Sequence, residues 1–239
     1  MTVLLDVQDL SGGYGVSQVL FELGLQIGEG EVVTLLGRNG MGKTTTIRAI
    51  LGLLKGATGR ISLNGSEILG TRPYKIARLG IGLVPEGREI FPTLTVRENL
   101  VATARGGDAA GAYNLQTIYD MFPRLKEREN NLGWQLSGGE QQMLAIGRAL
   151  ATNPRLLILD EATEGLAPTI RADIWRCLEN LRAKGMSMLI IDKNLKSLIE
   201  IADRHFVIEK GKIAWSGTSD DLRREQHVVS RYLLPYSAH

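Results

Sequence analysis

The chain has 239 residues, of which 44% are hydrophobic and 23% are charged, as in ordinary soluble folded proteins. This length suits one large α/β domain with room for a small additional lobe. The 28 basic and 26 acidic residues leave a formal net charge of +2, which argues against a nucleic-acid-binding protein.

No apolar run approaches the roughly 20 residues that a membrane-spanning helix needs, and the N-terminus lacks a basic stretch followed by an apolar one. We therefore expect a cytoplasmic chain without an anchor. The single cysteine, Cys177, lies at helical spacing among apolar residues and is expected to face the core. The histidines at positions 205, 227 and 239 have no ligand spacing, which argues against a zinc site.

Residues 4–10 and 18–27 alternate apolar and polar side chains, which predicts an antiparallel β region near the N-terminus. Tyr14 lies between them in the glycine-flanked segment 11–15, which we interpret as a turn. Its ring could be a small satellite of the core, or it could stack on the face of an adenine base. The residues alone leave both interpretations open.

A phosphate-binding pattern, GxxxxGK[ST], follows at positions 37–44. Its residues are Gly37, Arg38, Asn39, Gly40, Met41, Gly42, Lys43 and Thr44. The β-branched run 31–36 before it predicts a strand, and the spacing of Ile47, Ile50 and Leu51 after it predicts a helix. The pattern thus has the strand-to-helix context that a phosphate loop requires, which disfavours an ordinary glycine-rich turn.

Each part of this loop suits the binding of a nucleoside triphosphate. The glycines allow backbone N–H groups to point inward at an anion, and the following helix presents the positive end of its dipole. Lys43 supplies a charge for the β- and γ-phosphates, and Thr44 supplies a hydroxyl for Mg²⁺.

The middle of the chain predicts helices and a loop that faces outward. The loop 87–99 mixes charged and apolar side chains and suits docking onto another protein, although a plain helical insertion would also fit. Residues 103–112 are rich in small side chains and predict a variable loop. Helical spacing resumes over 113–122 and is expected to stop at Pro123.

The segment Leu136-Ser137-Gly138-Gly139-Glu140 opens the next predicted helix. Ser137 and Glu140 form a capping box, which many helices use for stability alone. Two glycines in the first turn oppose that explanation, because each costs roughly 1 kcal/mol relative to alanine. Bare backbone at a helix N-terminus instead suits a second contact with phosphate.

Four apolar residues at 156–159 predict a buried strand that ends in two carboxylates, Asp160 and Glu161. Asp160 can hold Mg²⁺, directly or through water, and Glu161 is placed to orient or deprotonate a water that attacks the γ-phosphate. The alternative is an ordinary surface turn after a strand. Further strands are expected at 60–65, 79–85 and 186–191, with a hairpin at 204–216 and a helix after it.

Taken in order, the phosphate loop, LSGGE and LLILDE resemble the nucleotide-binding subunit of ATP-binding-cassette (ABC) transporters over essentially the whole chain. The resemblance implies an α/β fold with a P-loop NTPase core of the ABC ATPase type, an antiparallel β subdomain and a small helical subdomain. It implies one domain over 1–239, with the nucleotide-binding core in 1–86 and 155–239 and the helical subdomain in 87–154. The LSGGE segment in this subdomain stands for the family's signature motif.

The resemblance also implies roles for individual residues. The residues expected to bind nucleotide are Tyr14, the loop from Gly37 to Thr44, Thr45, Glu86, Ser137, Gly138, Gly139, Glu140 and Asp160. The expected Mg²⁺ ligands are Thr44, Asp160 and Glu86, and Lys43, Glu161 and Lys193 are expected to act in catalysis. In this family the dimer is head-to-tail, so the LSGGE segment would face the γ-phosphate bound to a partner subunit.

Within the family, the segments 84–88, 164–168 and 228–233 are similar to the second ATPase of branched-chain amino-acid importers. Glu86 stands where the wider family has glutamine and Ala167 where it has aspartate, and both are usual in this subgroup. Lys193 stands where the wider family has a histidine that contacts the γ-phosphate, and similar chains tend to carry glutamine. Its side chain could contact the phosphate or swing into solvent.

The resemblance therefore implies an ATP-hydrolysing motor subunit of a membrane importer for branched-chain or related amino acids, with ATP and Mg²⁺ as its cofactors. The expected partners are transmembrane permease subunits, a second ABC ATPase subunit in a heterodimer or homodimer, and a solute-binding protein that acts through the permease. No nucleic acid is expected. The expected location is peripheral, on the inner face of the cell membrane.

Two alternatives remain beside this function. A soluble mechanochemical ATPase acting on DNA or ribosomes would carry a long coiled-coil insertion or two cassettes, whereas only about ninety residues separate Thr44 from Leu136. A nucleotide-binding regulatory subunit with weak hydrolysis is compatible with Lys193. Turnover by the isolated chain distinguishes the regulatory subunit from an ATPase.

Overall fold

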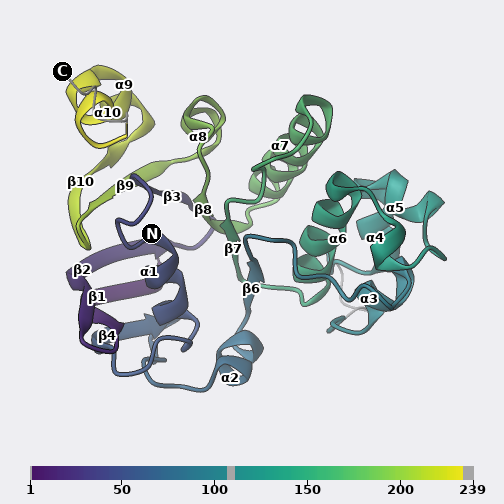
Figure 1. Ribbon diagram of the computed structural model, residues 1–239, viewed down its shortest axis with the longest axis horizontal. Coiled ribbons are helices and arrows are strands. Elements are labelled where there is room, and N and C mark those ends of the chain that lie inside the picture. Colours follow the sequence, from purple (N-terminus) through teal and green to yellow (C-terminus); the bar gives the residue numbers. More distant parts are fainter. Residues whose placement is uncertain (1, 107–110, 234–239) are drawn as a thin grey trace.

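The computed structural model describes residues 2–106 and 111–233, which form two sheets and several groups of helices (Figure 1). One sheet has the strand order β2-β1-β4-β5 and the other has the order β10-β9-β3-β8-β7-β6. The predicted α/β class is confirmed. Residues 107–110 of the loop predicted at 103–112, and the histidine at position 239, lie outside the described part of the chain.

The smaller sheet is antiparallel, as the alternating N-terminal pattern predicts. Its strands are β1 (Val3–Tyr14), β2 (Ser17–Gly28), β4 (Thr58–Leu63) and β5 (Ser66–Glu67). The interpretation of residues 11–15 as a turn was wrong for most of that segment. Gly13 and Tyr14 still pair with Gln18 and Ser17, so β1 continues to Tyr14.

The larger sheet contains the strands predicted from the runs at 31–36, 156–159 and 186–191. Its strands are β3 (Val32–Leu36), β6 (Ile81–Val84), β7 (Leu156–Asp160), β8 (Ser187–Ile191), β9 (Arg204–Glu209) and β10 (Lys212–Thr218). All neighbours are parallel except β9 and β10, which form the predicted hairpin. Every residue of β3, β7 and β8 is buried, as expected of parallel strands covered on both faces.

Helices cover both faces of this sheet. Helix α1 (Lys43–Ile50) shares a core with the antiparallel sheet and with one face of the larger sheet, through Ile47 and Ile50. On the other face, α7 (Pro168–Ala183) and α8 (Leu195–Ile201) pack Ile174 and Leu198 into a second core. Beside β6, at one edge of the larger sheet, lies α2 (Pro73–Arg78). Near β9 and β10, at the other edge, lie α9 (Ser219–Arg224) and α10 (Gln226–Tyr232) (Figure 1). In the described chain, no helix combines the length and apolar character required to cross a membrane.

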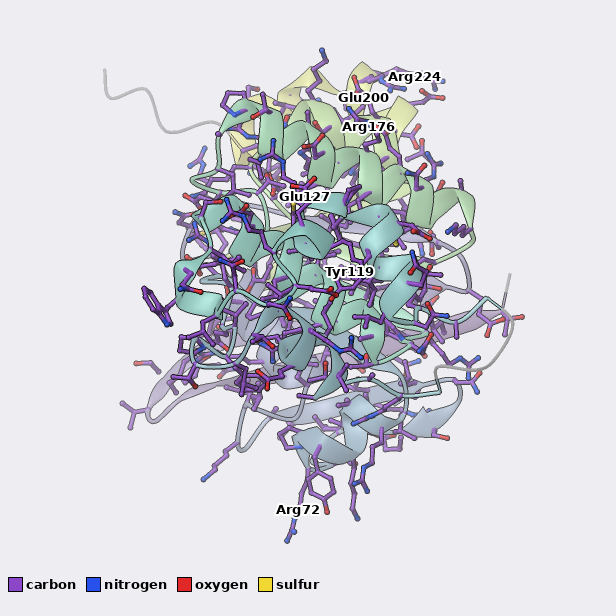
Figure 2. All side chains as sticks on the ribbon, turned by 90° about the vertical axis from the view of Figure 1, so that its right-hand side faces the viewer. Arg72, Tyr119, Glu127, Arg176, Glu200 and Arg224 are labelled. Carbon is purple, nitrogen blue, oxygen red and sulfur yellow. The ribbon has the colours of Figure 1, made fainter. Side chains whose placement is uncertain are left out.

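A group of helices stands at one side of the molecule, beyond β6 (Figure 1). It contains α3 (Val96–Val101), α4 (Leu115–Met121), α5 (Pro123–Glu127) and α6 (Gly138–Ala151). Figure 2 views this side, with Tyr119 of α4 near its centre. Pro123 ends α4 as predicted but also opens α5, because a proline fits the first turn of a helix, where its missing N–H has no partner to lose.

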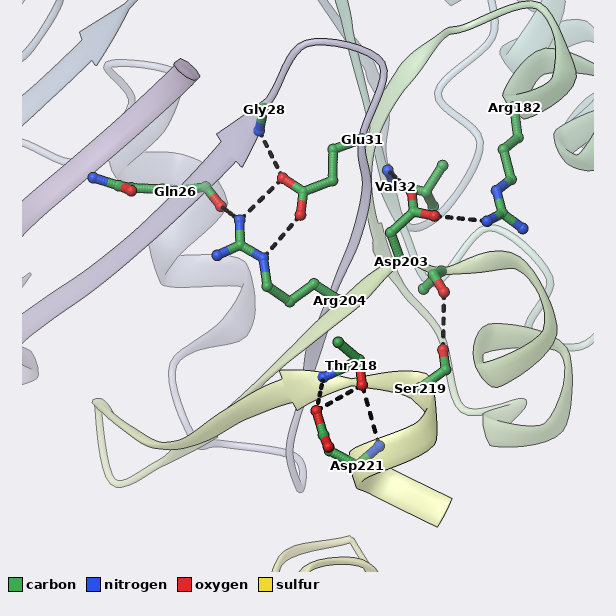
Figure 3. Close-up of polar contacts among 11 residues, drawn as sticks. Gln26, Gly28, Glu31, Val32, Arg182, Asp203, Arg204, Thr218, Ser219 and Asp221 are labelled. Carbon is green, nitrogen blue, oxygen red and sulfur yellow. Dashed lines mark hydrogen bonds and ion pairs between the residues drawn. The ribbon is translucent and has the colours of Figure 1, made fainter. Parts of the chain in front are cut away.

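Buried polar contacts fix the start of β3 against β9 (Figure 3). The carboxylate of Glu31 accepts hydrogen bonds from the Gly28 N–H at 2.7 Å and from Arg204 at 2.8 and 3.0 Å. The carboxylate of Asp203 accepts the Val32 N–H at 2.8 Å. These contacts set the position from which β3 runs toward the phosphate loop.

Replacement of Glu31 by glutamine should lower the free energy of unfolding by about 1–3 kcal/mol, because the charge-assisted bonds of a buried carboxylate are weakened. Glu29 provides a matched control, since its ion pair with Arg155 has both side chains 47% exposed. Glu29→Gln should cost less than about 1 kcal/mol. Denaturant unfolding of both variants checks the prediction, and equal losses would contradict it.

Candidate functional site

A pocket of about 550 Å³ opens where β3, β6, β7 and β8 end. It is lined by Val19, Asn39, Gly40, Gly42, Lys43, Thr44, Thr45, Glu86, Glu161, Glu164 and Lys193. An adjoining hollow is lined by Gly37 and Arg38 and shares Asn39, Lys43, Glu161 and Lys193 with the first. The structure therefore brings most of the predicted phosphate and catalytic residues together, and Glu164 joins them.

The phosphate loop lies tightly against β9. A Cβ atom at Gly37 would lie 2.5 Å from the carbonyl oxygen of Ile208, and Gly42 has φ 111°, so glycine is required at both positions. The Met41 N–H donates to the Arg38 carbonyl within the loop at 3.4 Å. The loop thus has the strand-to-helix geometry that its sequence predicts.

Lys43 is turned toward the loop itself. Its ammonium donates to the carbonyl oxygens of Gly37 at 2.9 Å and Arg38 at 3.2 Å. Partial burial lowers the pKa of Lys43, and the nearby carboxylates of Glu161 and Asp160 act in the opposite direction. The cation is held at the rim of the pocket, in reach of an incoming phosphate.

Asp160 and Thr44 fit a magnesium ion. Asp160 is only 4% exposed, and its Oδ1 atom is buried without a hydrogen-bond partner in the described chain. Burial raises the pKa of Asp160, while a hydrogen bond with the Thr44 side chain lowers it. A buried carboxylate oxygen that lacks a donor suits a hard cation, because Mg²⁺ prefers oxygen ligands. Glu86 is exposed, and its negative charge further raises the pKa of Asp160.

Glu161 leaves β7 with an unusual backbone conformation. Its φ of 50° is left-handed, and its N–H donates to the Ile191 carbonyl at 2.8 Å. Such strained positions in non-glycine residues concentrate at functional sites. The side chain is 12% exposed, and burial raises the pKa of Glu161, which suits a group that accepts a proton from water.

Lys193 pairs with two carboxylates while its side chain remains 52% exposed. Its ammonium lies 3.3 Å from Oε2 of Glu161 and 2.5 Å from Oε1 of Glu164. The contact with Glu164 raises the pKa of Lys193. The pKa of Glu164 is lowered by its hydrogen bonds with Glu161 and Lys193. From the sequence, Glu164 was considered only as part of the segment 164–168 and was assigned no role in the site, although a third carboxylate three residues after Glu161 is a signal that could have found it.

A second pair of residues joins the loops that carry these charges. The Asp192 carboxylate accepts the Thr163 hydroxyl at 2.7 Å and the Thr163 N–H at 3.2 Å. Its other oxygen accepts the Asn194 N–H at 2.9 Å. Asp192 therefore holds the turn after β7 against the turn after β8, a role that the sequence analysis missed.

Tyr14 lies at the surface at the end of β1, with 45% of its area exposed. Arg48 of α1 donates to its hydroxyl at 3.4 Å, and the guanidinium carbon lies 6.0 Å from the ring centroid. Tyr14 is therefore not a satellite of the core. It does not line the phosphate pocket, and its stacking on adenine stays a prediction.

The LSGGE segment lies outside the phosphate pocket of its own chain. Its predicted capping box is present, because Ser137 Oγ accepts the Glu140 N–H at 3.3 Å and Glu140 accepts the Ser137 N–H at 2.8 Å. The carboxylate of Glu140 is thereby used within its own helix, beside Arg128 at 3.8 Å. What this segment can offer to a phosphate bound outside its own chain is therefore the backbone N–H groups of its first turn, not the Glu140 side chain.

Close packing gives Gly139 of the signature a second explanation. A Cβ atom at Gly139 would lie 2.7 Å from the Ile170 side chain, whereas one at Gly138 would meet only the end of the flexible Arg88 side chain, which can move aside. From the sequence, these glycines were explained only by phosphate binding or helix stability. The structure adds the close approach of two neighbouring segments.

The ABC transporter family model matches residues 20–164, which include the phosphate loop, the signature, Asp160 and Glu161. The chain belongs to the ABC transporter family. It is accordingly an ATPase subunit of a transporter, of a type that binds and hydrolyses ATP, dimerises and works with transmembrane permease components. The predicted family and activity are confirmed.

Individual relatives agree over nearly the full length. The high-affinity branched-chain amino acid transport ATP-binding protein BraG of Pseudomonas aeruginosa is 40% identical, over 96% of this chain and 99% of that protein. The lipopolysaccharide export system ATP-binding protein LptB of Haemophilus influenzae is 32% identical, over 96% and 97%. A solved structure of an ATP-binding subunit of an ABC transporter has a TM-score of 0.83 at 32% identity and covers 96% of each chain.

Replacement of Lys43 by alanine should weaken ATP binding at least about tenfold, because a charge-assisted contact with phosphate is lost. The exposed Lys75 of α2 provides a control of the same kind, and Lys75→Ala should bind as the parent does. Titration of each protein with Mg-ATP checks the prediction. Parental affinity in Lys43→Ala would refute the phosphate-loop assignment.

Proposed function

We propose that this chain is the ATP-hydrolysing motor subunit of a membrane importer for branched-chain or related amino acids. The observation that carries the proposal is the 40% identity to BraG over nearly the full chain, against 32% for the lipopolysaccharide export protein. The segments 84–88, 164–168 and 228–233 support the same subgroup. By analogy with its relatives, the chain would act on the cytoplasmic face of the membrane.

The site supplies what ATP hydrolysis requires. The loop amides and Lys43 would bind the phosphates, and Thr44, Asp160 and Glu86 would hold Mg²⁺, which neutralises charge that develops on the phosphates. Glu161, at the pocket wall, would orient the attacking water and take its proton. Tyr14, on the surface beside α1, would stack on the adenine.

Glu161→Gln should keep ATP binding and lower turnover by roughly a hundred- to ten-thousand-fold, because the amide retains the shape of the side chain but cannot accept the proton. Single-turnover hydrolysis and binding measured on the same preparation check this. Glu179→Gln, on the exposed side of α7, is the matched control and should turn over as the parent does. Undiminished hydrolysis by Glu161→Gln would move the catalytic role elsewhere.

The position of the signature supports assembly with a second ATPase subunit. Since the first turn of α6 does not line its own phosphate pocket, Ser137, Gly138 and Gly139 would contact ATP bound to the partner. Lys193 favours a partner that differs from this chain, because an ammonium cannot accept a proton from the attacking water as a neutral imidazole can. Purification of the complex from membranes, identification of its subunits and uptake assays with leucine, isoleucine and valine test the assembly and the substrate.

A groove beside β6 suits contact with the permease. Its hollow of about 300 Å³ is lined by residues of α2, β6 and α6, together with Leu53 and Glu89. Leu53 is 53% exposed, and Phe91 is 41% exposed with the Arg148 guanidinium 4.1 Å above its ring. The loop predicted to dock another protein thus borders this groove, and we propose a cytoplasmic segment of the permease as its occupant.

Leu53→Asp should remove most of the stimulation of ATP hydrolysis by the permease while turnover of the isolated chain stays unchanged, because a carboxylate would be desolvated in the contact. Val3, 42% exposed and not part of the groove, provides the control Val3→Asp. ATPase assays with and without reconstituted permease check both variants. Full stimulation of Leu53→Asp would place the permease contact on another surface.

A further inference from the structure

The catalytic carboxylate is engaged by a cation from its own chain. In the described residues, Lys193 is the cation that lies within ion-pair distance of Glu161, and the same ammonium contacts Glu164. Lys43 is held by carbonyl oxygens of the phosphate loop. An ammonium that contacts Glu161 competes with any water that this carboxylate would bind.

We propose that Glu164 is a positioning residue that anchors Lys193 as a latch on Glu161, and that the terminal phosphate of ATP opens this latch by competing for the ammonium. The latch is defined by Lys193, Glu161 and Glu164. The proposal rests on the proposed function, in which Glu161 acts on water, and adds a regulatory step to it.

The backbone around the latch is fixed by a separate contact. Thr163 and Asp192 are hydrogen-bonded, and Glu164 and Lys193 are the residues that follow them in the chain. The two side chains therefore start from loops with a set separation. The side chains of Lys193 and Glu164 are 52% and 46% exposed and that of Glu161 is 12% exposed, so the ammonium lies at the pocket mouth and contacts a carboxylate on its wall.

The terminal phosphate is suited to open this latch. Lys193, Glu161 and Glu164 all line the phosphate pocket, so a bound triphosphate would place its oxygens beside the ammonium. A phosphate group offers more charge and more acceptor oxygens than one carboxylate. ADP lacks this group. Release of Glu161 would therefore depend on bound ATP. Without ATP, Lys193 would keep the Glu161 carboxylate from binding a solvent water.

The nucleotide affinity of Glu164→Gln by itself would not isolate the latch, because this substitution also removes a negative charge near the phosphates. That general effect favours ATP whether or not Lys193 is present. A static ion pair between Lys193 and Glu164 has the same energy before and after binding, so it adds nothing to a double-mutant cycle on binding. A pair that weakens on binding does contribute.

The test compares dissociation constants for a non-hydrolysable ATP analogue and for ADP, with Mg²⁺, in the full chain and in Glu164→Gln, Lys193→Gln and the double variant. The measured quantity is the ratio of the dissociation constant for ADP to that for the analogue. Glu164→Gln should raise this ratio in both backgrounds, and the rise should be about two- to fivefold larger in the parent than in Lys193→Gln. Glu164→Asp should restore the parental ratio, and Glu179→Gln should leave it unchanged. Equal shifts in the two backgrounds would overturn the latch.

A second cycle tests the other arm, with Glu161→Gln in place of Glu164→Gln. The same excess is expected when Lys193 is present, and its absence would show that the ammonium does not leave Glu161 on binding. The proposed function fails by different results, which are no binding of the analogue by the parent or parental turnover in Glu161→Gln. Binding by the parent with equal shifts refutes the latch alone.

Discussion

The parallel pairing of β3, β8 and β7 is the constraint on which the whole site depends. Thr34 pairs with Ile190, and Asp160 pairs with Ile191, so the three strands end at nearly the same level of the sheet. The phosphate loop, the turn at Glu161 and the turn at Asp192 therefore begin side by side. Because each turn carries charge, the sheet register brings cations and carboxylates to one end of the sheet.

Features encoded by residues close together in the chain were predictable. The phosphate loop, the capping box of Ser137 and Glu140 and the buried strand before Asp160 depend on neighbours within about one turn or one strand, so their patterns carry the geometry. The hairpin of β9 and β10 was predictable for the same reason. Hence most of the fold and the phosphate half of the site follow from the sequence.

Features that depend on distant segments were not predictable. Glu164 and Lys193 are 29 residues apart and meet only because two turns are hydrogen-bonded through Thr163 and Asp192. Gly139 is required by Ile170 of another helix, which no local pattern reveals. Even the extent of β1 to Tyr14 was set by cross-strand pairing, which overrode the turn signal of its glycines.

The balance of charge in the pocket implies that ATP binding is an exchange of partners. Carboxylate oxygens of Glu86, Glu161 and Glu164 lie within 4.8 Å of one another, a repulsive arrangement that Lys193 offsets by contacting two of them. Lys43 donates to two loop carbonyls and has a third N–H that can donate to a phosphate. In the latch proposed above, phosphate displaces the contacts of Lys193 with the carboxylates, so part of its binding energy is used to rearrange the site. The ions that bind ATP thus also determine when the base becomes free.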